Sequence, residues 1–411
     1  MIEKDILLIG NGPAALAREV GEQIDNFDGI VVRFNHYTTK GYEKFVGSRT
    51  DYWIVCQKFP PLLGEKHIKR FYSSWSFDKA AEDEVESIKA ERIPRDLMIR
   101  AVKISDVNHP STGIIATNFF QEQNYKIWIY GFDFLTTQRK HHYNDDSITR
   151  GPWHDEFGEW TYFHKLHEQG KVKWFGFNPE TESGPLVRQP FPCGNDKDIS
   201  WYRTVAHNAW YEWFGSLSKG KSILDVGAGM CEGMKILDKY SPDVRGIDVD
   251  KRLLKLDPRL TLKTLDEISD NSVDVITCVD VIEHVVEDIK LMDNMKRVAK
   301  EMIFVTTPCY ARSRCGNIAH CREYTIPQFM NFFKPSEIWS ASPDGKVHLT
   351  KVLSRKGNVI RNHSGEGPDN KRESKFVYHT NYVPVTTKFN NTVDGEEWAH
   401  IAACFLKNNG L

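Results

Sequence analysis

Two stretches of the chain share one pattern, in which a short apolar run leads into a glycine turn. The first run covers residues 5–9 and ends at Gly10-Asn11-Gly12. The second covers residues 222–226 and ends at Gly227-Ala228-Gly229. Short apolar runs that end in glycine are typical of buried parallel strands, and a helix usually follows the turn. The pattern therefore predicts two α/β domains, each beginning at its own glycine turn.

Further apolar runs extend the second domain. They recur at residues 244–247, 273–278, 302–306 and 399–405, with the lengths of strands rather than helices. The aromatic stretch at residues 201–214 has helical spacing, so it is predicted to form the first helix of this domain.

The apolar pattern breaks between the two domains. Residues 177–200 are rich in proline and glycine, which end regular elements. These residues are Pro179, Gly184, Pro185, Pro190, Pro192 and Gly194. We therefore place the first domain at residues 1–180, a linker at 181–200 and the second domain at 201–411.

Composition narrows the class of protein. The 411 residues are 40% hydrophobic and 27% charged, which suits two packed cores and excludes a disordered chain. A net charge of −2 gives no reason to expect a nucleic acid partner. The apolar run near the start is too short for a signal sequence or a membrane span, and the eight cysteines form no CxxC pair. We expect a cytoplasmic protein without a transmembrane segment.

The first glycine turn has the spacing Gly10-x-Gly12-x-x-Ala15, which in isolation is compatible with a dinucleotide site. Such a site also needs an acidic residue after the second strand to bind a ribose. The second apolar run, residues 29–32, is instead followed by Arg33-Phe34-Asn35. This favours a nucleotide bound by amides and a cation, and it makes an NAD-dependent oxidoreductase the least favoured reading.

The N-terminal half resembles the sialyltransferases of glycosyltransferase family 29. Four segments in the family's order carry the resemblance. They are residues 9–16 with 21–35 and 41–54 (large motif), 109–113 through 129–132 (small motif), 141–145 (third motif), and His154 with Glu159 (very small motif). The resemblance implies a sialyltransferase-type α/β domain, a variant of the GT-A fold.

The resemblance also implies an inverting, metal-independent transfer from a CMP-activated keto-sugar acid. The residues that would bind the CMP-sugar donor are Asn11, Asn35, Ser111, Thr112, Gly113 and Gly131. His154 would be the general base for the acceptor hydroxyl, and His142 would stabilise the departing phosphate. An oxocarbenium-like transition state needs a base on one face of the sugar and charge neutralisation on the other.

The chain departs from the secretory members of this family in two ways. Those members carry a membrane anchor and a disulfide between the large and small motifs, whereas this chain has Leu7, Leu8 and Asn124 where those cysteines are expected. Sialic acid and Kdo are therefore equally compatible as the donated sugar. The expected acceptor is a saccharide or a glycolipid, as in polysaccharide biosynthesis.

The C-terminal half resembles a class I S-adenosylmethionine-dependent methyltransferase, a seven-stranded α/β sandwich. Asp225 lies in the strand before the glycine turn, and Asp248 ends the next strand, where a carboxylate binds two ribose hydroxyls. The resemblance implies that Asp225, Gly227 and Gly229 lie beside the cofactor. It places Asp266, or its neighbour Leu265, at the adenine.

The segment Asp280-Val281-Ile282-Glu283-His284 suggests a metal site. If it is helical, its acidic residues and its histidine share one face. His320 lies where magnesium-dependent RNA 3′-terminal methyltransferases, which this segment resembles, place their last ligand. We therefore predict that Asp280, Glu283, His284 and His320 bind Mg²⁺, which would lower the pKa of the hydroxyl to be methylated. Without a metal, His284 or His320 would be the base.

Together these observations predict a bifunctional enzyme that transfers a keto-sugar acid and O-methylates a sugar hydroxyl. Two alternatives stay open. In the first, the N-terminal domain is a catalytically silent glycan- or nucleotide-binding module. In the second, the protein is a metal-dependent RNA ribose methyltransferase. The sequence does not predict the oligomeric state.

Overall fold

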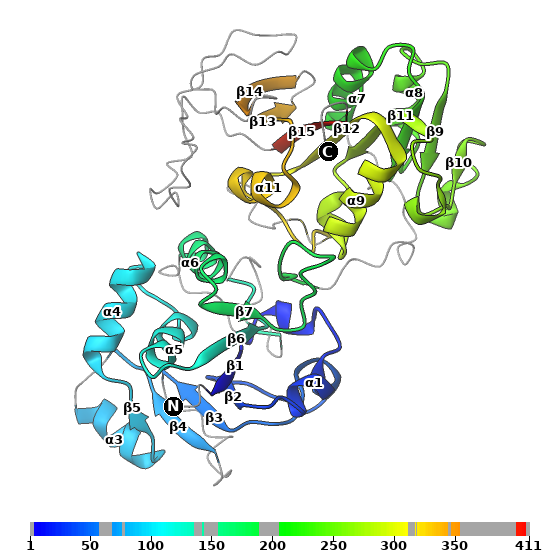
Figure 1. The fold of residues 1–411 in the computed structure, drawn as a ribbon. Helices are drawn as coiled ribbons and strands as arrows, with labels where there is room; N and C mark the ends of the chain where they lie inside the picture. The colour runs from blue at the N-terminus through cyan, green and yellow to red at the C-terminus, as the bar shows by residue number, and fades with distance from the viewer. Residues whose placement is uncertain are drawn as a thin grey trace. The chain divides into compact units, whose positions relative to one another are not determined.

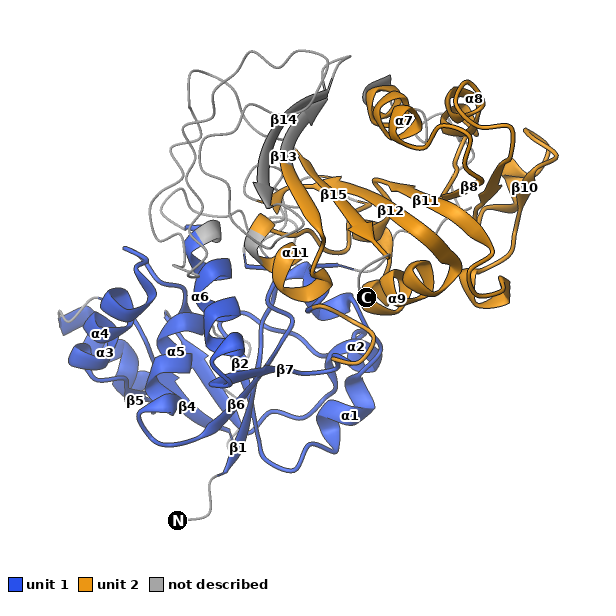
Figure 2. Ribbon diagram, turned by 45° about the horizontal axis from the view of Figure 1, so that its top comes forward, with its two compact units in different colours: residues 1–178, 184–189 blue, residues 179–183, 190–411 orange. Residues whose placement is uncertain are grey.

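The computed structural model describes residues 4–56, 68–75, 79–134, 142–143, 155–188, 205–310, 317, 319–343, 347–353 and 400–407. The chain divides into two compact units, coloured separately in Figure 2. Unit 1 contains residues 1–178 and 184–189, and unit 2 contains residues 179–183 and 190–411. No helix among the described residues is long and apolar enough to cross a membrane.

Unit 1 is built on a fully parallel sheet of seven strands in the order β5-β4-β3-β2-β1-β6-β7 (Figure 1). The strands are β1 Asp5–Ile9, β2 Ile30–Phe34, β3 Tyr52–Val55, β4 Lys69–Tyr72, β5 Glu91–Arg92, β6 Lys126–Tyr130 and β7 Val172–Trp174. The chain order reverses between β1 and β6. In sheets of this kind, ligands bind at such a reversal, beyond the carboxyl ends of the strands.

Helices cover both faces of this sheet. They are η1 Pro13–Leu16, α1 Gly21–Asp25, α2 Glu43–Val46, α3 Lys79–Ser87, α4 Arg95–Ser105, α5 Thr112–Gln121 and α6 Glu156–Glu168. On one face, Ile24 of α1 packs with Leu7 and Ile9 of β1. On the other face, Phe120 of α5 stacks on Tyr52 of β3. Alternate residues of the strands are therefore buried on opposite faces, as expected for a parallel sheet.

Unit 2 contains a sheet of eight strands in the order β10-β9-β8-β11-β12-β15-β13-β14. The strands are β8 Ile223–Val226, β9 Val244–Ile247, β10 Leu260–Thr261, β11 Val273–Val279, β12 Ala299–Pro308, β13 Glu337–Pro343, β14 Val347–Leu353 and β15 His400–Leu406. β15 lies antiparallel between β12 and β13. The predicted α/β fold is confirmed, and β14 adds an edge strand to the seven that were expected.

Two helical layers enclose this second sheet. The helices are α7 Val205–Leu217, α8 Glu232–Leu237, η4 Lys251–Leu253, η5 Leu265–Glu267, η6 Ile282–His284, α9 Asp288–Val298 and α11 Ile326–Phe333. Trp210 of α7 packs on the face of β11 that carries Val275. Met292 of α9 packs on the opposite face, with Ile276. The chain order reverses between β8 and β11, so this unit also has a preferred ligand position at the carboxyl ends of its strands.

Candidate functional site

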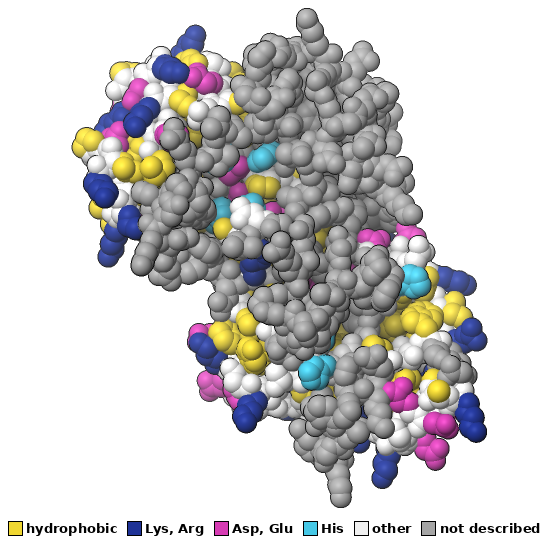
Figure 3. All heavy atoms as spheres, turned by 180° about the vertical axis from the view of Figure 1, so that it is seen from behind, with side chains coloured by type: hydrophobic (Ala, Val, Ile, Leu, Met, Phe, Trp, Pro, Cys, Tyr) yellow, Lys and Arg dark blue, Asp and Glu magenta, His cyan; other side chains and the backbone are white. Residues whose placement is uncertain are grey.

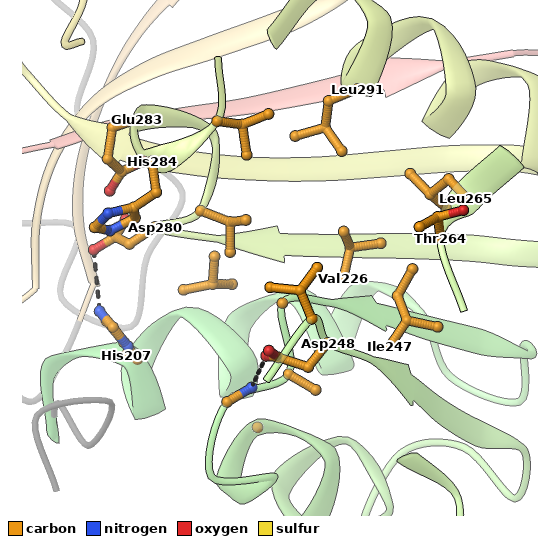
Figure 4. A pocket seen from close by; sticks show the side chains of 18 of the residues that line it. His207, Val226, Ile247, Asp248, Thr264, Leu265, Asp280, Glu283, His284 and Leu291 are labelled. Atoms are coloured by element: carbon orange, nitrogen blue, oxygen red, sulfur yellow. Dashed lines mark hydrogen bonds and ion pairs between the residues drawn. The ribbon is translucent and has the colours of Figure 1, made fainter. Parts of the chain in front are cut away.

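Unit 2 contains a cavity of about 620 Å³ at the reversal between β8 and β11. Its lining includes four of the predicted cofactor residues: Gly227, Gly229, Asp248 and Asp266. Figure 4 shows Leu265 on one side of this cavity and Asp280, Glu283 and His284 on the other, with Asp248 between them. One pocket therefore combines the predicted nucleoside residues with the predicted acidic and imidazole residues.

The glycine turn after β8 is shaped by its neighbours. Gly227 has a φ of +72°, and a Cβ on it would lie 2.5 Å from Cγ2 of Val281. Only glycine fits both constraints without strain. The backbone N–H of Gly229 donates to Oδ2 of Asp248 over 2.9 Å, so the carboxylate at the end of β9 is fixed against the turn.

Asp225 and Asp266 differ sharply in their surroundings. Asp225 is fully buried outside the lining of the cavity and accepts hydrogen bonds from Thr277 and Tyr211. Burial raises the pKa of Asp225 to about 7. Asp266 is exposed at the rim, where its carboxylate accepts a hydrogen bond from Nδ2 of Asn294 over 2.9 Å. The structure therefore places Asp225 between α7 and β11, outside the lining of the cavity, and Asp266 at its rim.

The predicted helical face at residues 280–284 is wrong. This segment forms a single 3-10 turn, η6, and Asp280 precedes it with a φ of +52°. As a result, Asp280 does not share a face with Glu283 and His284. The side chains that could share one cation within the described residues are instead Glu283, His284 and His320, whose ligand atoms lie within 4.8 Å of one another.

Both imidazoles of this cluster are oriented by hydrogen bonds at Nδ1. Nδ1 of His284 lies 2.9 Å from the carbonyl oxygen of Ala319, so it is the donor. Nδ1 of His320 lies 2.5 Å from Oε1 of Glu323. In a neutral ring this arrangement leaves the lone pair on Nε2, the state in which histidine binds metals. Burial, followed by the neighbouring His320, lowers the pKa of His284 to about 4, so the ring stays neutral.

Glu283 completes the cluster. Its Oε2 accepts a hydrogen bond from Thr307 over 3.0 Å, whereas Oε1 is buried without a hydrogen-bond partner among the described residues. Burial and the nearby charge of Asp280 raise the pKa of Glu283 well above its usual value. A cation at this position would satisfy the buried oxygen and supply the missing positive charge.

Asp280 makes different contacts. Its Oδ2 accepts hydrogen bonds from Nε2 of His207 over 3.1 Å and from Nε2 of His400 over 3.0 Å. Its Oδ1 accepts one from the Thr306 hydroxyl over 2.6 Å. Burial alone would raise the pKa of Asp280, but the two imidazoles outweigh burial and hold it well below its usual value.

Unit 1 contains a cavity of about 280 Å³ at the reversal between β1 and β6. All of the predicted donor-binding residues line it, together with His142. They are Asn11, Asn35, Ser111, Thr112, Gly113 and Gly131. A Cβ on Gly10 would lie 2.6 Å from the carbonyl oxygen of Gly131, so the two strand ends approach closely at the floor of this cavity. His154, the predicted base, lies outside the described residues.

The amide side chains in this cavity are fixed by the fold. Nδ2 of Asn11 donates to the carbonyl oxygen of Phe34 over 2.7 Å. Oδ1 of Asn35 accepts from the backbone N–H of Cys56 over 3.0 Å. The sequence also led us to expect that the cation near Asn35, Arg33, contacts the nucleotide. Arg33 does not line the cavity, so this expectation is wrong. Its guanidinium is buried and donates to the carbonyl oxygens of Val46 and Arg49.

Glu159 joins the predicted very small and small motifs. Its carboxylate accepts hydrogen bonds from the backbone N–H of Ser111 over 3.0 Å and from the Ser111 hydroxyl over 2.7 Å. Ser111 in turn caps the N-terminus of α5. Burial raises the pKa of Glu159 to about 8, so this wall of the cavity is largely uncharged at neutral pH.

Two segments of the chain match known protein families. Residues 7–60 match glycosyltransferase family 29 (sialyltransferase). Residues 224–302 match a methyltransferase domain. Each segment contains the glycine turn that follows the first strand of one unit. The chain joins a sialyltransferase-like unit to a methyltransferase unit. We use these names for units 1 and 2 from here on.

Comparison with solved structures finds both kinds of neighbour. A mammalian sialyltransferase is 20% identical over 42% of this chain and 69% of its own, with a TM-score of 0.35. A SAM-dependent methyltransferase from Aquifex aeolicus is 19% identical over 34% of this chain and 87% of its own, with a TM-score of 0.29. Comparison with curated protein sequences finds no match.

Several pocket residues were not predicted from the sequence. In the methyltransferase unit these are His207 and His400, which meet Asp280 from positions 73 and 120 residues away. In the sialyltransferase-like unit, Trp75 and Asp133 also line the cavity. No local pattern marks these residues, because only the folded sheet brings them to the strand ends.

Proposed function

We propose that the protein is a bifunctional glycan-modifying enzyme. The sialyltransferase-like unit would transfer sialic acid or Kdo from its CMP donor, with inversion, to a saccharide or glycolipid. The methyltransferase unit would use S-adenosylmethionine to O-methylate a sugar hydroxyl. The observation that carries this proposal is that each family-matched segment supplies residues that line the pocket where its own sheet reverses. A cytoplasmic location stays a prediction.

In the sialyltransferase-like unit, Asn11 and Asn35 are suited to fix a cytidylate because their amides are already held by the backbone. Residues 111–113 present a capped helix N-terminus, which favours a phosphate. We assign the general base to His154 and the stabilisation of the departing phosphate to His142, which is buried in the cavity lining.

In the methyltransferase unit, Asp248 is suited to bind the two ribose hydroxyls of the cofactor because its carboxylate is fixed at the end of β9. Leu265 and the exposed Asp266 would border the adenine. The turn at Gly227 and Gly229 leaves room for the methionine part of the cofactor. S-adenosylmethionine supplies the methyl group as a sulfonium.

The donor set Glu283, His284 and His320 fits a divalent cation, and we propose Mg²⁺ there. Bound Mg²⁺ would lower the pKa of an acceptor hydroxyl. His284 and His320 hold their Nε2 lone pairs toward the cluster, and Glu283 offers a buried oxygen. Mg²⁺ prefers oxygen ligands, so water and the acceptor oxygens would complete its shell.

Turnover of the CMP donor tests the first half of the proposal. We expect the protein to release CMP from CMP-sialic acid or CMP-Kdo in the presence of an acceptor. His154→Ala should reduce this rate by about 10²-fold or more, since it removes the general base. His109→Ala is the control, because His109 is exposed and lies outside the cavity lining. Tight CMP binding without turnover would favour the silent binding module instead.

The RNA alternative is favoured only by the Glu283, His284 and His320 cluster. The lysine and arginine side chains seen in Figure 3 are scattered among acidic and apolar ones, and they form no continuous basic stripe on the described part of that face. A phosphate backbone is bound mainly by such a stripe. Binding of a short duplex RNA at low salt would revive this alternative.

A further inference from the structure

A second group of imidazoles lies in the pocket of the methyltransferase unit. His207 comes from α7, Asp280 follows β11, and His400 begins β15. The Nε2 atoms of both histidines lie within 3.1 Å of the same carboxylate oxygen, Oδ2 of Asp280. Figure 4 shows His207 pointing at Asp280 from across the end of the pocket. The group is separate from the cation cluster because Asp280 is not one of the side chains that converge there.

The backbone around Asp280 is held in an unusual state. Asp280 has a φ of +52°, a left-handed conformation that non-glycine residues rarely adopt. Its backbone N–H and its Oδ1 are both bonded to Thr306 of β12. Strained residues that the surrounding structure holds in place gather at functional sites. The conformation directs the carboxylate toward the two imidazoles rather than into the core.

The hydrogen bonds fix the tautomer of His207. The pKa of Asp280 is held well below its usual value, so its carboxylate only accepts hydrogen bonds and Nε2 of His207 is the donor. In the neutral ring, Nδ1 then carries the lone pair. Within the described residues Nδ1 of His207 makes no hydrogen bond, and the side chain is 25% exposed in the cavity lining. His207 is therefore an oriented imidazole with a basic nitrogen open to the pocket.

The other imidazoles of the pocket are less suited to take a proton from an acceptor. Nδ1 of His400 is buried. His284 and His320 have their Nδ1 atoms bonded to Ala319 and Glu323, and their Nε2 atoms face the cation cluster. His207 is therefore better placed to act as the base than His284 or His320, the two residues expected from the sequence. The sequence analysis did not identify His207 as a candidate.

We propose that His207 is the general base of the methyl transfer and that Asp280 is its positioning residue. This inference rests on the proposed methyltransferase function. The acceptor oxygen forms a bond to the methyl carbon of the sulfonium donor, and the carbon–sulfur bond breaks with its electron pair left on sulfur. The hydroxyl proton passes to Nδ1 of His207 and then to water. Asp280 holds the ring and stabilises the imidazolium, as a carboxylate does in catalytic dyads.

Kinetics with two His207 variants test the proposal. The wild-type protein is incubated with S-adenosylmethionine and free Kdo or free N-acetylneuraminic acid. We expect His207→Ala and His207→Gln to lower kcat by about 10²- to 10⁴-fold, with KM changed less than threefold. Added imidazole should restore part of the activity of His207→Ala. Ser216→Ala is the control on the same helix, because Ser216 is exposed and bonds only to the Trp213 carbonyl among the described residues.

A second readout does not depend on activity. Nitrogen NMR of the protein labelled at histidine should show His207 as the tautomer protonated at Nε2, and Asp280→Asn should shift this equilibrium. Titration with S-adenosylhomocysteine should give the wild-type affinity for both His207 variants.

Three results would overturn the proposal. They are a His207→Gln variant with wild-type kcat, a His207 ring protonated at Nδ1, and a loss of S-adenosylhomocysteine binding that accounts for the lost activity. A wild-type protein that binds S-adenosylhomocysteine but methylates neither sugar would refute the proposed sugar methylation, and the role of His207 with it.

Discussion

At the scale of single residues, each pocket contains a buried glutamate whose pKa is raised by burial. These residues are Glu159 in the sialyltransferase-like unit and Glu283 in the methyltransferase unit. Glu159 has a pKa of about 8 in the folded protein, against 4.5 for the free group. A raised pKa means that Glu159 favours folding most below about pH 4.5 and that this contribution is lost as the pH rises through about 8. Glu159→Gln keeps the neutral shape and cannot ionise.

We therefore predict a difference in pH dependence between the two proteins. From pH 5 to pH 9, the sialyltransferase-like unit of the wild type should lose stability relative to Glu159→Gln, by at most about 1.4 kcal/mol for each pH unit. Calorimetric unfolding across this range measures the difference. Parallel pH profiles would show that Glu159 is ionised in the folded state.

Asp248 provides the residue-scale test of the methyltransferase pocket. Asp248→Ala removes the carboxylate that we assign to the ribose hydroxyls and should weaken S-adenosylhomocysteine binding by about 10- to 100-fold. Asp266→Ala should have a smaller effect, because Asp266 is exposed at the rim. Calorimetric titration of both variants gives the comparison, and equal affinities would place the ribose elsewhere.

Local patterns in the sequence marked residues that line the two pockets. Asn11, Gly227 and Asp248 each end or follow a strand, so the turn itself marks them. No local pattern could predict the contacts of Asp280. Its carboxylate binds His207 and His400, which lie 73 and 120 residues away in the sequence, instead of joining Glu283 and His284.

At the scale of elements, the glycine turn after β8 is fitted to the segment after β11. Gly227→Ala places a Cβ against Val281 and forces an alanine to a φ of +72°. We expect this variant to lose about 2–4 kcal/mol of stability and to bind S-adenosylhomocysteine poorly. Adding Val281→Ala should restore only the part due to the clash. Chemical unfolding of the single and double variants measures both terms, and a fully stable Gly227→Ala would contradict the turn geometry.

The N-terminus of α9 carries a buried charged network. Asp288 forms an ion pair with Arg322 over 2.8 Å and accepts hydrogen bonds from Tyr324 and from both the backbone N–H and the hydroxyl of Ser183. Asp288→Ala removes the nearer of the two carboxylates that pair with the buried guanidinium and leaves only Glu182 at 3.4 Å, which should cost about 3–5 kcal/mol. Ser183→Ala should cost about 1 kcal/mol. Thermal unfolding of the methyltransferase unit compares the stability losses of the two variants. A loss for Asp288→Ala as small as that for Ser183→Ala would contradict this account.

The positions of the strands agree closely with the apolar runs in the sequence. The runs at residues 5–9 and 244–247 coincide with β1 and β9, because strands buried on both faces are continuous in sequence. The short segment at residues 280–284 did not follow its helical spacing. Tertiary bonds from Asp280 to β12, α7 and β15 outweigh the weak preference of five residues for an α-helix.

At the scale of the whole molecule, two sheets with different strand orders place a pocket at each reversal. If both units modify one glycan, the product of sugar transfer should be methylated faster than the bare acceptor. Rates of methyl transfer to the two substrates decide this, and equal rates would mean that the fusion does not couple the reactions.

The central claim is that this one chain binds a cytidylate and a sulfonium nucleoside at separate sites. Calorimetric titration of the full chain with CMP, with S-adenosylhomocysteine and with both together tests this claim most directly. We predict one site for each ligand, with affinities that do not change when the other is bound. Absence of binding heat for either ligand, or competition between the two, would contradict the account.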